Sequence, residues 1–196
     1  MDDFLNIKKH VARYIQLTEE EENYFTSLLR IINVKKKQFI VQPEFICKYR
    51  SYVVNGAMRA YLIDSMGQDH TIAFAIEDWW ISDFYSYINQ VPATQFVEAL
   101  EDSTLIQIDY NAEQLLMEMV PKFERFFRIT SQRAFAFLQK RMLSNLSKTA
   151  EERYEEFIEK YPAIARRVPQ YTLASYLGFT TEFLSKIRSK RTNKLN

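Results

Sequence analysis

The chain has 196 residues, of which 47% are hydrophobic and 15% aromatic, with only 3 Gly and 5 Pro. This composition excludes a disordered or low-complexity chain and suffices for one large or two small domains. A single cysteine excludes an intramolecular disulfide. No apolar run approaches the roughly 18 residues that a membrane helix needs, and no secretory leader is recognisable. We therefore expect a cytoplasmic protein without a membrane segment.

The first predicted element is a short amphipathic helix near the N-terminus. Thr18 precedes four glutamates, and Glu21 is placed to close a capping box at the helix start. Apolar residues then recur at helical spacing: Tyr24, Phe25, Leu28, Leu29 and Ile32. This spacing predicts a helix that continues to about residue 32.

Between about Lys37 and Asp109 the apolar residues alternate with a period of two, which is typical of strands. The pattern predicts six strands, over residues 38–41, 51–54, 58–62, 70–74, 95–100 and 105–108. Asn55-Gly56 and the segment 65–68 are suited to tight hairpin turns. Short strands at this spacing indicate a small antiparallel β-barrel or jelly roll.

After Asp109 the pattern becomes helical and remains so to the end of the chain. One apolar stripe steps by four and three residues in turn and is formed by Phe123, Phe127, Thr130, Ala134 and Phe137. Part of this stripe is expected to pack on the barrel of its own chain. Its heptad spacing also favours a homodimer, with these five residues as the predicted interface.

A second capping box, Thr149 with Glu152, opens a further helix that Pro162 is expected to stop. The segment from Tyr161 to Pro169 is predicted to be a hinge. The predicted fold class is α+β, with a barrel and N-terminal helix over 1–110, a dimerisation helix over 111–145 and an all-α domain over 146–196.

The C-terminal segment has the pattern of a helix-turn-helix. Pro169 suits the first turn of a helix whose inward face is Leu173, Ala174 and Leu177. Gly178 permits a sharp turn, Thr180 is placed to cap the next helix, and Leu184 and Ile187 anchor that helix.

The outward side chains of this second helix are short polar or basic groups, the kind that a DNA major groove accommodates. Glu182 is suited to accept from a cytosine amino group and Lys186 to donate to guanine, while Gln170, Tyr171 and Lys190 are placed for the DNA backbone. The predicted DNA-contacting set is Gln170, Tyr171, Thr180, Thr181, Glu182, Ser185, Lys186, Arg188 and Lys190. A structural helix pair with a solvated face, or one that binds a protein, remains the alternative.

The charge distribution favours the DNA hypothesis. Residues 164–196 carry seven Lys and Arg against Glu182 alone, a net charge of +6. The other 163 residues carry 19 basic and 24 acidic side chains, a net charge of −5. A cationic segment that coincides with a helix-turn-helix pattern indicates a polyanionic partner, and double-stranded DNA is the predicted one.

The order of these parts resembles the Crp/Fnr superfamily of bacterial transcription regulators. The likeness spans nearly the whole chain and is most specific in LASYLGFTTEFLSKIRSK and FAIEDWWISDFYSYINQVPATQFVEALEDSTLIQID. The wording EDWWISD and VEALEDS is similar to the branch found in Bacteroidetes-type bacteria. The resemblance implies a homodimer on palindromic DNA near promoters, with RNA polymerase as a further partner. Thr181, Glu182 and Lys186 match the three main base-reading positions of the family.

The effector site departs from the nucleotide-binding members of this family. They hold a cyclic nucleotide with a Gly-Glu pair and a later Arg-Ser/Thr pair, where this chain has Ser82-Asp83 and Ala93-Thr94. Without the arginine a buried phosphate would lack its counter-charge. We therefore expect no tight binding of cyclic AMP, and either a different small-molecule effector or a pocket filled by aromatic residues such as Trp79 and Trp80.

Other classes of protein fit the sequence less well. A cupin-like enzyme needs several metal ligands, but the only histidines are His10 and His70, so we expect no catalytic residues and no metal. One cysteine cannot supply a Cys₄ iron–sulfur cluster, so no cofactor is expected. Cys47 is interpreted as a small buried residue rather than a redox sensor. Arg59 is expected to form an ion pair rather than an anion site.

Overall fold

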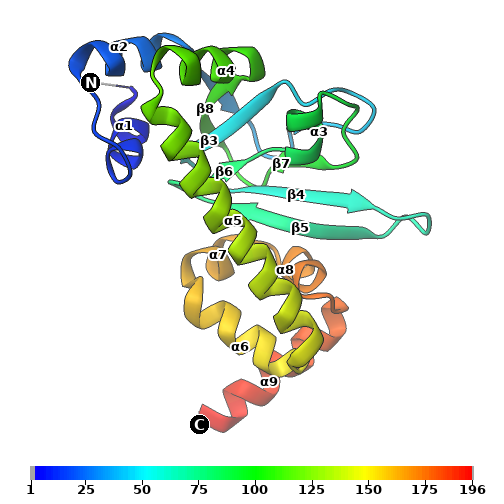
Figure 1. Cartoon of the computed structure of the whole chain (residues 1–196). Helices are drawn as coiled ribbons and strands as arrows, with labels where there is room; N and C mark the ends of the chain where they lie inside the picture. The colour runs from blue at the N-terminus through cyan, green and yellow to red at the C-terminus, as the bar shows by residue number, and fades with distance from the viewer. Residues whose placement is uncertain (1–2, 196) are drawn as a thin grey trace.

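The computed structural model describes residues 3–195 of the chain, with side chains as far as residue 191. A β-barrel domain lies at one end and a helical domain at the other, and the long helix α5 (Lys122–Ser147) runs along both (Figure 1). Two short helices, α1 (Leu5–Ala12) and α2 (Glu19–Ser27), precede the barrel. No helix within residues 3–195 combines the length and the apolarity that a membrane crossing needs.

The barrel consists of two four-stranded antiparallel sheets. The first has the order β1 (Leu29–Val34), β8 (Ser103–Asp109), β3 (Tyr49–Asn55), β6 (Trp80–Ile81). The second has the order β2 (Phe39–Val41), β7 (Phe96–Ala99), β4 (Met58–Ile63), β5 (Asp69–Ala75). The six predicted strands and the antiparallel jelly-roll class are confirmed, whereas β1, β6 and the short helix α3 (Phe84–Asn89) were not predicted.

The helix predicted to reach residue 32 is correct at its start and wrong at its end. Thr18 and Glu21 form the predicted capping box, with Thr18 Oγ1 accepting from the Glu21 amide and Glu21 accepting in return. The helix stops at Ser27, and Leu29 to Val34 instead pair with β8 along their whole length. The β-branched Ile31, Ile32 and Val34 favour this ladder over a further helical turn.

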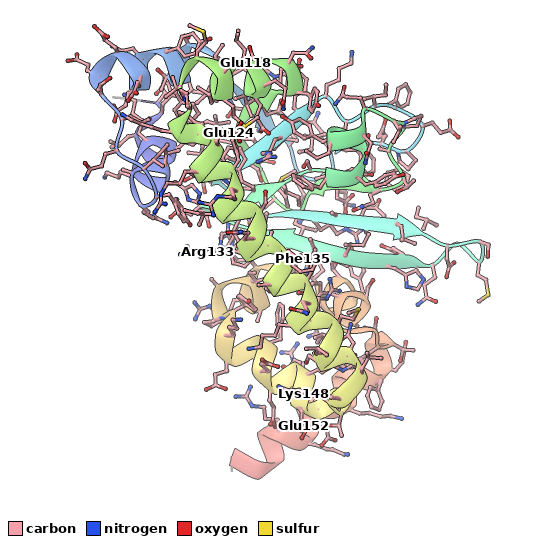
Figure 2. All side chains as sticks on the ribbon, viewed as in Figure 1. Glu118, Glu124, Arg133, Phe135, Lys148 and Glu152 are labelled. Carbon is pink, nitrogen blue, oxygen red and sulfur yellow. The ribbon has the colours of Figure 1, made fainter. Side chains whose placement is uncertain are left out.

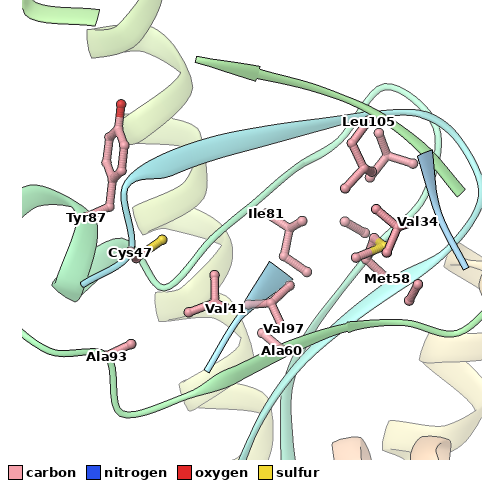
Figure 3. Packing of buried hydrophobic residues seen from close by; sticks show 13 residues of the cluster. Val34, Val41, Cys47, Met58, Ala60, Ile81, Tyr87, Ala93, Val97 and Leu105 are labelled. Atoms are coloured by element: carbon pink, nitrogen blue, oxygen red, sulfur yellow. The ribbon is translucent and has the colours of Figure 1, made fainter. Parts of the chain in front are cut away.

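The barrel core fills the space between the two sheets. Figure 3 shows side chains from both sheets converging there, among them Met58, Val97 and Leu105, all fully buried. Gly56 makes the predicted hairpin between β3 and β4, with a backbone φ of +113°. A Cβ atom there would lie 2.7 Å from the Ser103 backbone, so only glycine fits this close approach.

Helices α1, α2, α4 (Tyr110–Met119) and α5 cover the outer face of the first sheet. The start of α5 supplies Phe123, Phe126 and Phe127, which are buried with Tyr52 and Ile106 of the sheet. The segment predicted as one helix over 111–145 is two helices, because Pro121 lacks the amide hydrogen that would continue α4. The first turns of α5 are therefore anchored on the barrel, and its second half extends past the barrel along the helical domain.

The helical domain contains α6 (Ala150–Lys160), α7 (Pro162–Arg167), α8 (Gln170–Leu177) and α9 (Thr181–Leu195). The predicted capping box of Thr149 and Glu152 is present at the start of α6. Two details of the prediction were wrong. The predicted hinge contains α7, which Pro162 begins, and Pro169 precedes α8 rather than lying in its first turn.

Hydrogen bonds connect helix α8 to the backbone of β5, directly beneath the barrel in Figure 1. The Ser175 hydroxyl donates to the Asp69 carbonyl at 2.7 Å and accepts from the Thr71 amide at 2.8 Å. Arg141 of α5 donates to the carbonyls of Ile72 and of Tyr176 in α8. The barrel, the long helix and the helical domain thus meet at one junction.

Candidate DNA interface

The turn between α8 and α9 has the geometry predicted from its glycine. Gly178 adopts a left-handed conformation with φ +74°, and its amide donates to the Ser175 carbonyl at 3.1 Å. The next amide, of Phe179, donates to the Ala174 carbonyl at 2.9 Å, which closes the end of α8. Leu184 and Ile187 of α9 are buried with Leu173, Ala174 and Leu177 of α8, as predicted. The second helix therefore has a fixed inner face.

The start of α9 is capped as predicted. Thr180 Oγ1 accepts a hydrogen bond from the Phe183 amide at 3.2 Å. Hydrogen bonds from its own backbone amide and from the Thr180 hydroxyl lower the pKa of Glu182 below its ordinary value. Glu182 is thus an ionised acceptor at the exposed beginning of α9.

All nine residues predicted to contact DNA are solvent-exposed: Gln170, Tyr171, Thr180, Thr181, Glu182, Ser185, Lys186, Arg188 and Lys190. On a helix, residues four apart lie on the same face, so Thr181 aligns with Ser185 and Glu182 aligns with Lys186. The outer face of α9 therefore presents alternating acceptors, hydroxyls and cations to solvent. This is the arrangement that the sequence pattern predicted.

Some of the C-terminal cations form ion pairs with other parts of the chain and do not add free positive charge to this face. Arg167 makes a two-pronged ion pair with Glu77 at 2.6 and 2.9 Å and also pairs with Glu101. The Arg167 guanidinium lowers the pKa of Glu77 to about 2. Lys190 pairs with Glu151 of α6 at 2.9 Å, and Lys194 lies outside the described side chains. The cationic character of the face is hence smaller than the count of residues implies.

The four residues predicted for the effector pocket lie together, and hydrogen bonds of Asp83 connect the segments that contain them. Asp83 is fully buried, and its two oxygens accept from the amides of Ser86 at 3.1 Å and Thr94 at 3.0 Å. Ala93 is also buried, and its amide donates to the Phe45 carbonyl. Asp83 therefore caps α3 and ties it to the segment containing Ala93 and Thr94, with Ser82 half-buried beside it.

Three other candidate residues have structural partners. Arg59 pairs with Glu98 at 2.6 Å and Asp69 at 2.8 Å, which confirms the predicted ion pair. Cys47 is buried, and burial raises the pKa of its thiol, so it is a packing residue as predicted. Trp80 is half-buried and donates to His10 Nε2 at 3.3 Å.

No group of three or more His, Cys, Asp or Glu side chains suited to a metal ion occurs among the described residues. His70 pairs with Asp64 at 2.8 Å on the β4–β5 hairpin, away from His10 in the core. His70 is therefore held within its own hairpin, and His10 joins α1 to Trp80 of the barrel.

Much of the predicted dimer stripe is covered by its own chain, so Phe123 and Phe127 of the predicted interface require correction. Phe123 and Phe127 are buried in the core of their own chain. The Phe137 ring packs on Tyr161 of the helical domain, with ring centroids 6.4 Å apart. Thr130 is half-buried and donates to carbonyls of its own helix, so only Ala134 is fully open to solvent. Phe123, Phe127 and Phe137 therefore pack within their own chain, whereas Ala134 is exposed.

A second apolar stripe of α5 is exposed instead. It consists of Phe135, Leu138, Met142, Leu143 and Leu146, whose exposed fractions are 69, 52, 59, 56 and 80%. Figure 2 labels Phe135 on the middle of this helix. Steps of three, four and four residues from Phe135 to Leu146 were visible in the sequence. Helical spacing alone could not tell which of the two apolar faces the barrel would cover.

Comparison with known proteins identifies the class of fold. No protein-family model matches the chain, and no curated protein matches it. Solved structures that do match include CooA from Carboxydothermus hydrogenoformans over 94% of this chain and a cyclic nucleotide-binding domain from Methylobacillus flagellatus over 71% of it. The chain has the predicted α+β architecture, with a cyclic-nucleotide-binding-like barrel, a long helix and a C-terminal helical domain.

Three of these structures show the extent of the likeness. FixK2 from Bradyrhizobium japonicum is 20% identical with a TM-score of 0.71, covering 85% of each chain. The c-di-GMP responsive global regulator CLP from Xanthomonas campestris is 12% identical with a TM-score of 0.71, covering 90% of this chain and 93% of that one. A protein from Eubacterium rectale assigned to the Crp/Fnr family of transcriptional regulators is 17% identical, with a TM-score of 0.69 and coverages of 90 and 85%. At these identities the likeness establishes the fold.

Proposed function

We propose that the chain is a bacterial transcriptional regulator of the Crp/Fnr type that binds double-stranded DNA as a homodimer. The observation that carries this proposal is the exposed polar face of α9, held in place by buried Leu184 and Ile187 behind the Gly178 turn. The fold shared with FixK2 and the Eubacterium rectale protein supports it. On this proposal α9 enters the major groove.

Within that groove, Thr181, Glu182 and Lys186 are proposed to read base edges. Gln170, Tyr171 and Lys190 are proposed to contact phosphates at either side. Lys190 would leave Glu151 to do so, at little cost because both side chains of that ion pair are well exposed. Thr180, Ser185 and Arg188 complete the proposed contact surface.

Two such helices are held in register if α5 pairs with α5 of a second copy. The exposed stripe from Phe135 to Leu146 is the proposed contact, in place of the residues predicted from the sequence. A continuous apolar stripe in water marks an interaction surface, and a two-fold axis makes one stripe complementary to itself. A palindromic site follows from this symmetry.

The base-reading assignment makes a specific prediction for two lysines. Lys186→Ala should weaken binding to a cognate duplex by about 1–3 kcal/mol and binding to random duplex much less. Lys190→Ala should weaken both by similar factors, since phosphates are the same in every sequence. Fluorescence anisotropy with both duplexes measures the four affinities. Equal losses on the two duplexes for Lys186→Ala would contradict its role in reading bases.

We propose that the predicted effector site, formed by Ser82, Asp83, Ala93 and Thr94, does not bind cyclic AMP. The phosphate would meet no arginine at Ala93 and would lie near the buried carboxylate of Asp83. Calorimetry with cyclic AMP should therefore show no saturable binding at micromolar concentrations. Micromolar affinity would contradict this account of the site.

Several finer points belong to the same proposal. We propose a cytoplasmic protein without enzymatic activity, in the branch found in Bacteroidetes-type bacteria, with RNA polymerase as a partner at promoters. The alternative is a small-molecule sensor whose helical C-terminus binds a protein. A steep fall of DNA affinity with salt distinguishes the regulator, because a protein partner of this surface releases no condensed counterions.

A further inference from the structure

A cleft lies where the long helix meets the helical domain. It is bounded by α5, α6 and α8; its cavity volume is about 70 Å³, and the rest of the cleft is open to solvent. Figure 1 shows α6 and α8 beside the lower half of α5. The barrel residues predicted for an effector do not line this cleft. A ligand here would touch all three helices that orient the DNA-binding domain.

The walls of the cleft combine aromatic rings with positive charge. Phe137 of α5, Phe157 and Tyr161 of α6 and Tyr176 of α8 supply the rings. Phe157 is central, with its ring centroid 5.5 Å from that of Tyr161 and 5.3 Å from that of Tyr176. Such a set offers apolar rings to a planar body, with Arg141 already 4.0 Å from the centre of the Tyr176 ring on one side.

Four cations and one anion line the same cleft, a formal charge of +3: Lys140, Arg141, Arg153, Lys160 and Glu156. Glu156 is shared by Lys140 at 3.3 Å and by Lys148 at 2.8 Å. Arg141 donates to backbone carbonyls. Two cations are therefore left for another acceptor.

Those two are Arg153 and Lys160. The Nε atom of Arg153 is buried and has no hydrogen-bond acceptor among the described residues, although Nη1 donates to Asn145 at 3.1 Å. Lys160 has no carboxylate partner in the described part of the chain, and its Nζ lies 5.2 Å from the centre of the Tyr161 ring. A buried donor without an acceptor is costly and rare in native proteins.

We propose that this cleft binds a small organic anion with a planar aromatic body, such as an aromatic carboxylate. The carboxylate accepts from Arg153 and Lys160, and the ring lies against the aromatic side chains of α5, α6 and α8. The Arg153 guanidinium also lies 4.7 Å from the centre of the Phe179 ring, in the turn before α9. A bound anion is thus one side chain away from the DNA-reading helix.

The test is calorimetric titration of the full chain with 2-naphthoate, without DNA. Saturable binding is expected, about tenfold or more tighter than for 2-naphthamide, which lacks the charge, and for acetate, which lacks the ring. Inorganic phosphate is a further probe of charge without a ring. Binding of acetate or phosphate as tight as that of naphthoate, or no saturable binding of naphthoate, would overturn the proposal.

Variants locate the site. Lys160→Gln should weaken naphthoate binding about tenfold, and this exposed side chain is not needed for folding. Lys36→Gln, the same change in the β1–β2 turn of the barrel, should leave the affinity unchanged. Equal affinities of wild type and Lys160→Gln would contradict the assignment. Because no DNA is present, this result is separate from the outcome of any DNA-binding experiment.

Discussion

Replacing Phe123 by alanine is expected to lower the free energy of unfolding by about 3–5 kcal/mol, the usual cost of removing a buried phenyl ring. Phe123 is fully buried, and its ring centroid lies 4.7 Å from that of Phe25 and 5.9 Å from that of Phe126. The cavity would open between α2, α5 and the first sheet. Anchoring of the long helix on the barrel depends on this cluster.

Urea denaturation measures the effect. Phe45→Ala is the matched control, because that ring is 67% exposed and its loss should change stability by less than about 0.5 kcal/mol. The loss at Phe123 should be the same at low and high protein concentration. A loss that grew on dilution would place Phe123 between two chains and restore the interface predicted from the sequence.

Replacing Leu138 by glutamate is expected to separate the dimer. Leu138 lies in the middle of the exposed stripe, and a two-fold axis would bring two carboxylates together where two leucines should pack. A single subunit contacts only half of a palindromic site, so the affinity for that site should fall about 100-fold or more. Sedimentation velocity measures the assembly and fluorescence anisotropy the affinity.

Gln42→Glu is the control for this variant. It also introduces a carboxylate at an exposed position, but in the barrel just after β2 and not on α5. It should sediment as a dimer and keep the affinity of the wild type within about threefold. Leu138→Glu behaving like Gln42→Glu would exclude the exposed stripe as the dimer contact.

The barrel was predictable where the sequence alternates cleanly and not where burial is irregular. Residues 58–62 and 105–108 alternate, and both are strands. Strand β1 was mistaken for helix, because Leu28 and Ile32 are four residues apart and continue the spacing of α2. Its pairing with β8, whose partner residues lie 69 to 79 positions away in the chain, decided the structure. Such non-local pairing leaves no mark in local periodicity.

The geometry of the helix-turn-helix was predictable because its determinants are local. The Gly178 turn, the Thr180 cap and the buried Leu184 all follow from neighbouring residues. Which cations remain unpaired could not be predicted locally. Arg167 forms ion pairs with Glu77 and Glu101, which lie in the barrel and are distant in the sequence. The cleft beside Arg153 is likewise formed by three helices, so no single segment of the sequence predicts it.

The central claim is that α9 reads duplex DNA from a dimer, and its most direct measurement is DNA affinity as a function of salt. Fragments of genomic DNA selected by the purified chain supply the duplex. Binding by a dimer is expected, with the logarithm of the affinity falling linearly with the logarithm of salt by about 0.9 per phosphate contacted. A monomer that binds no duplex even at low ionic strength would contradict the claim.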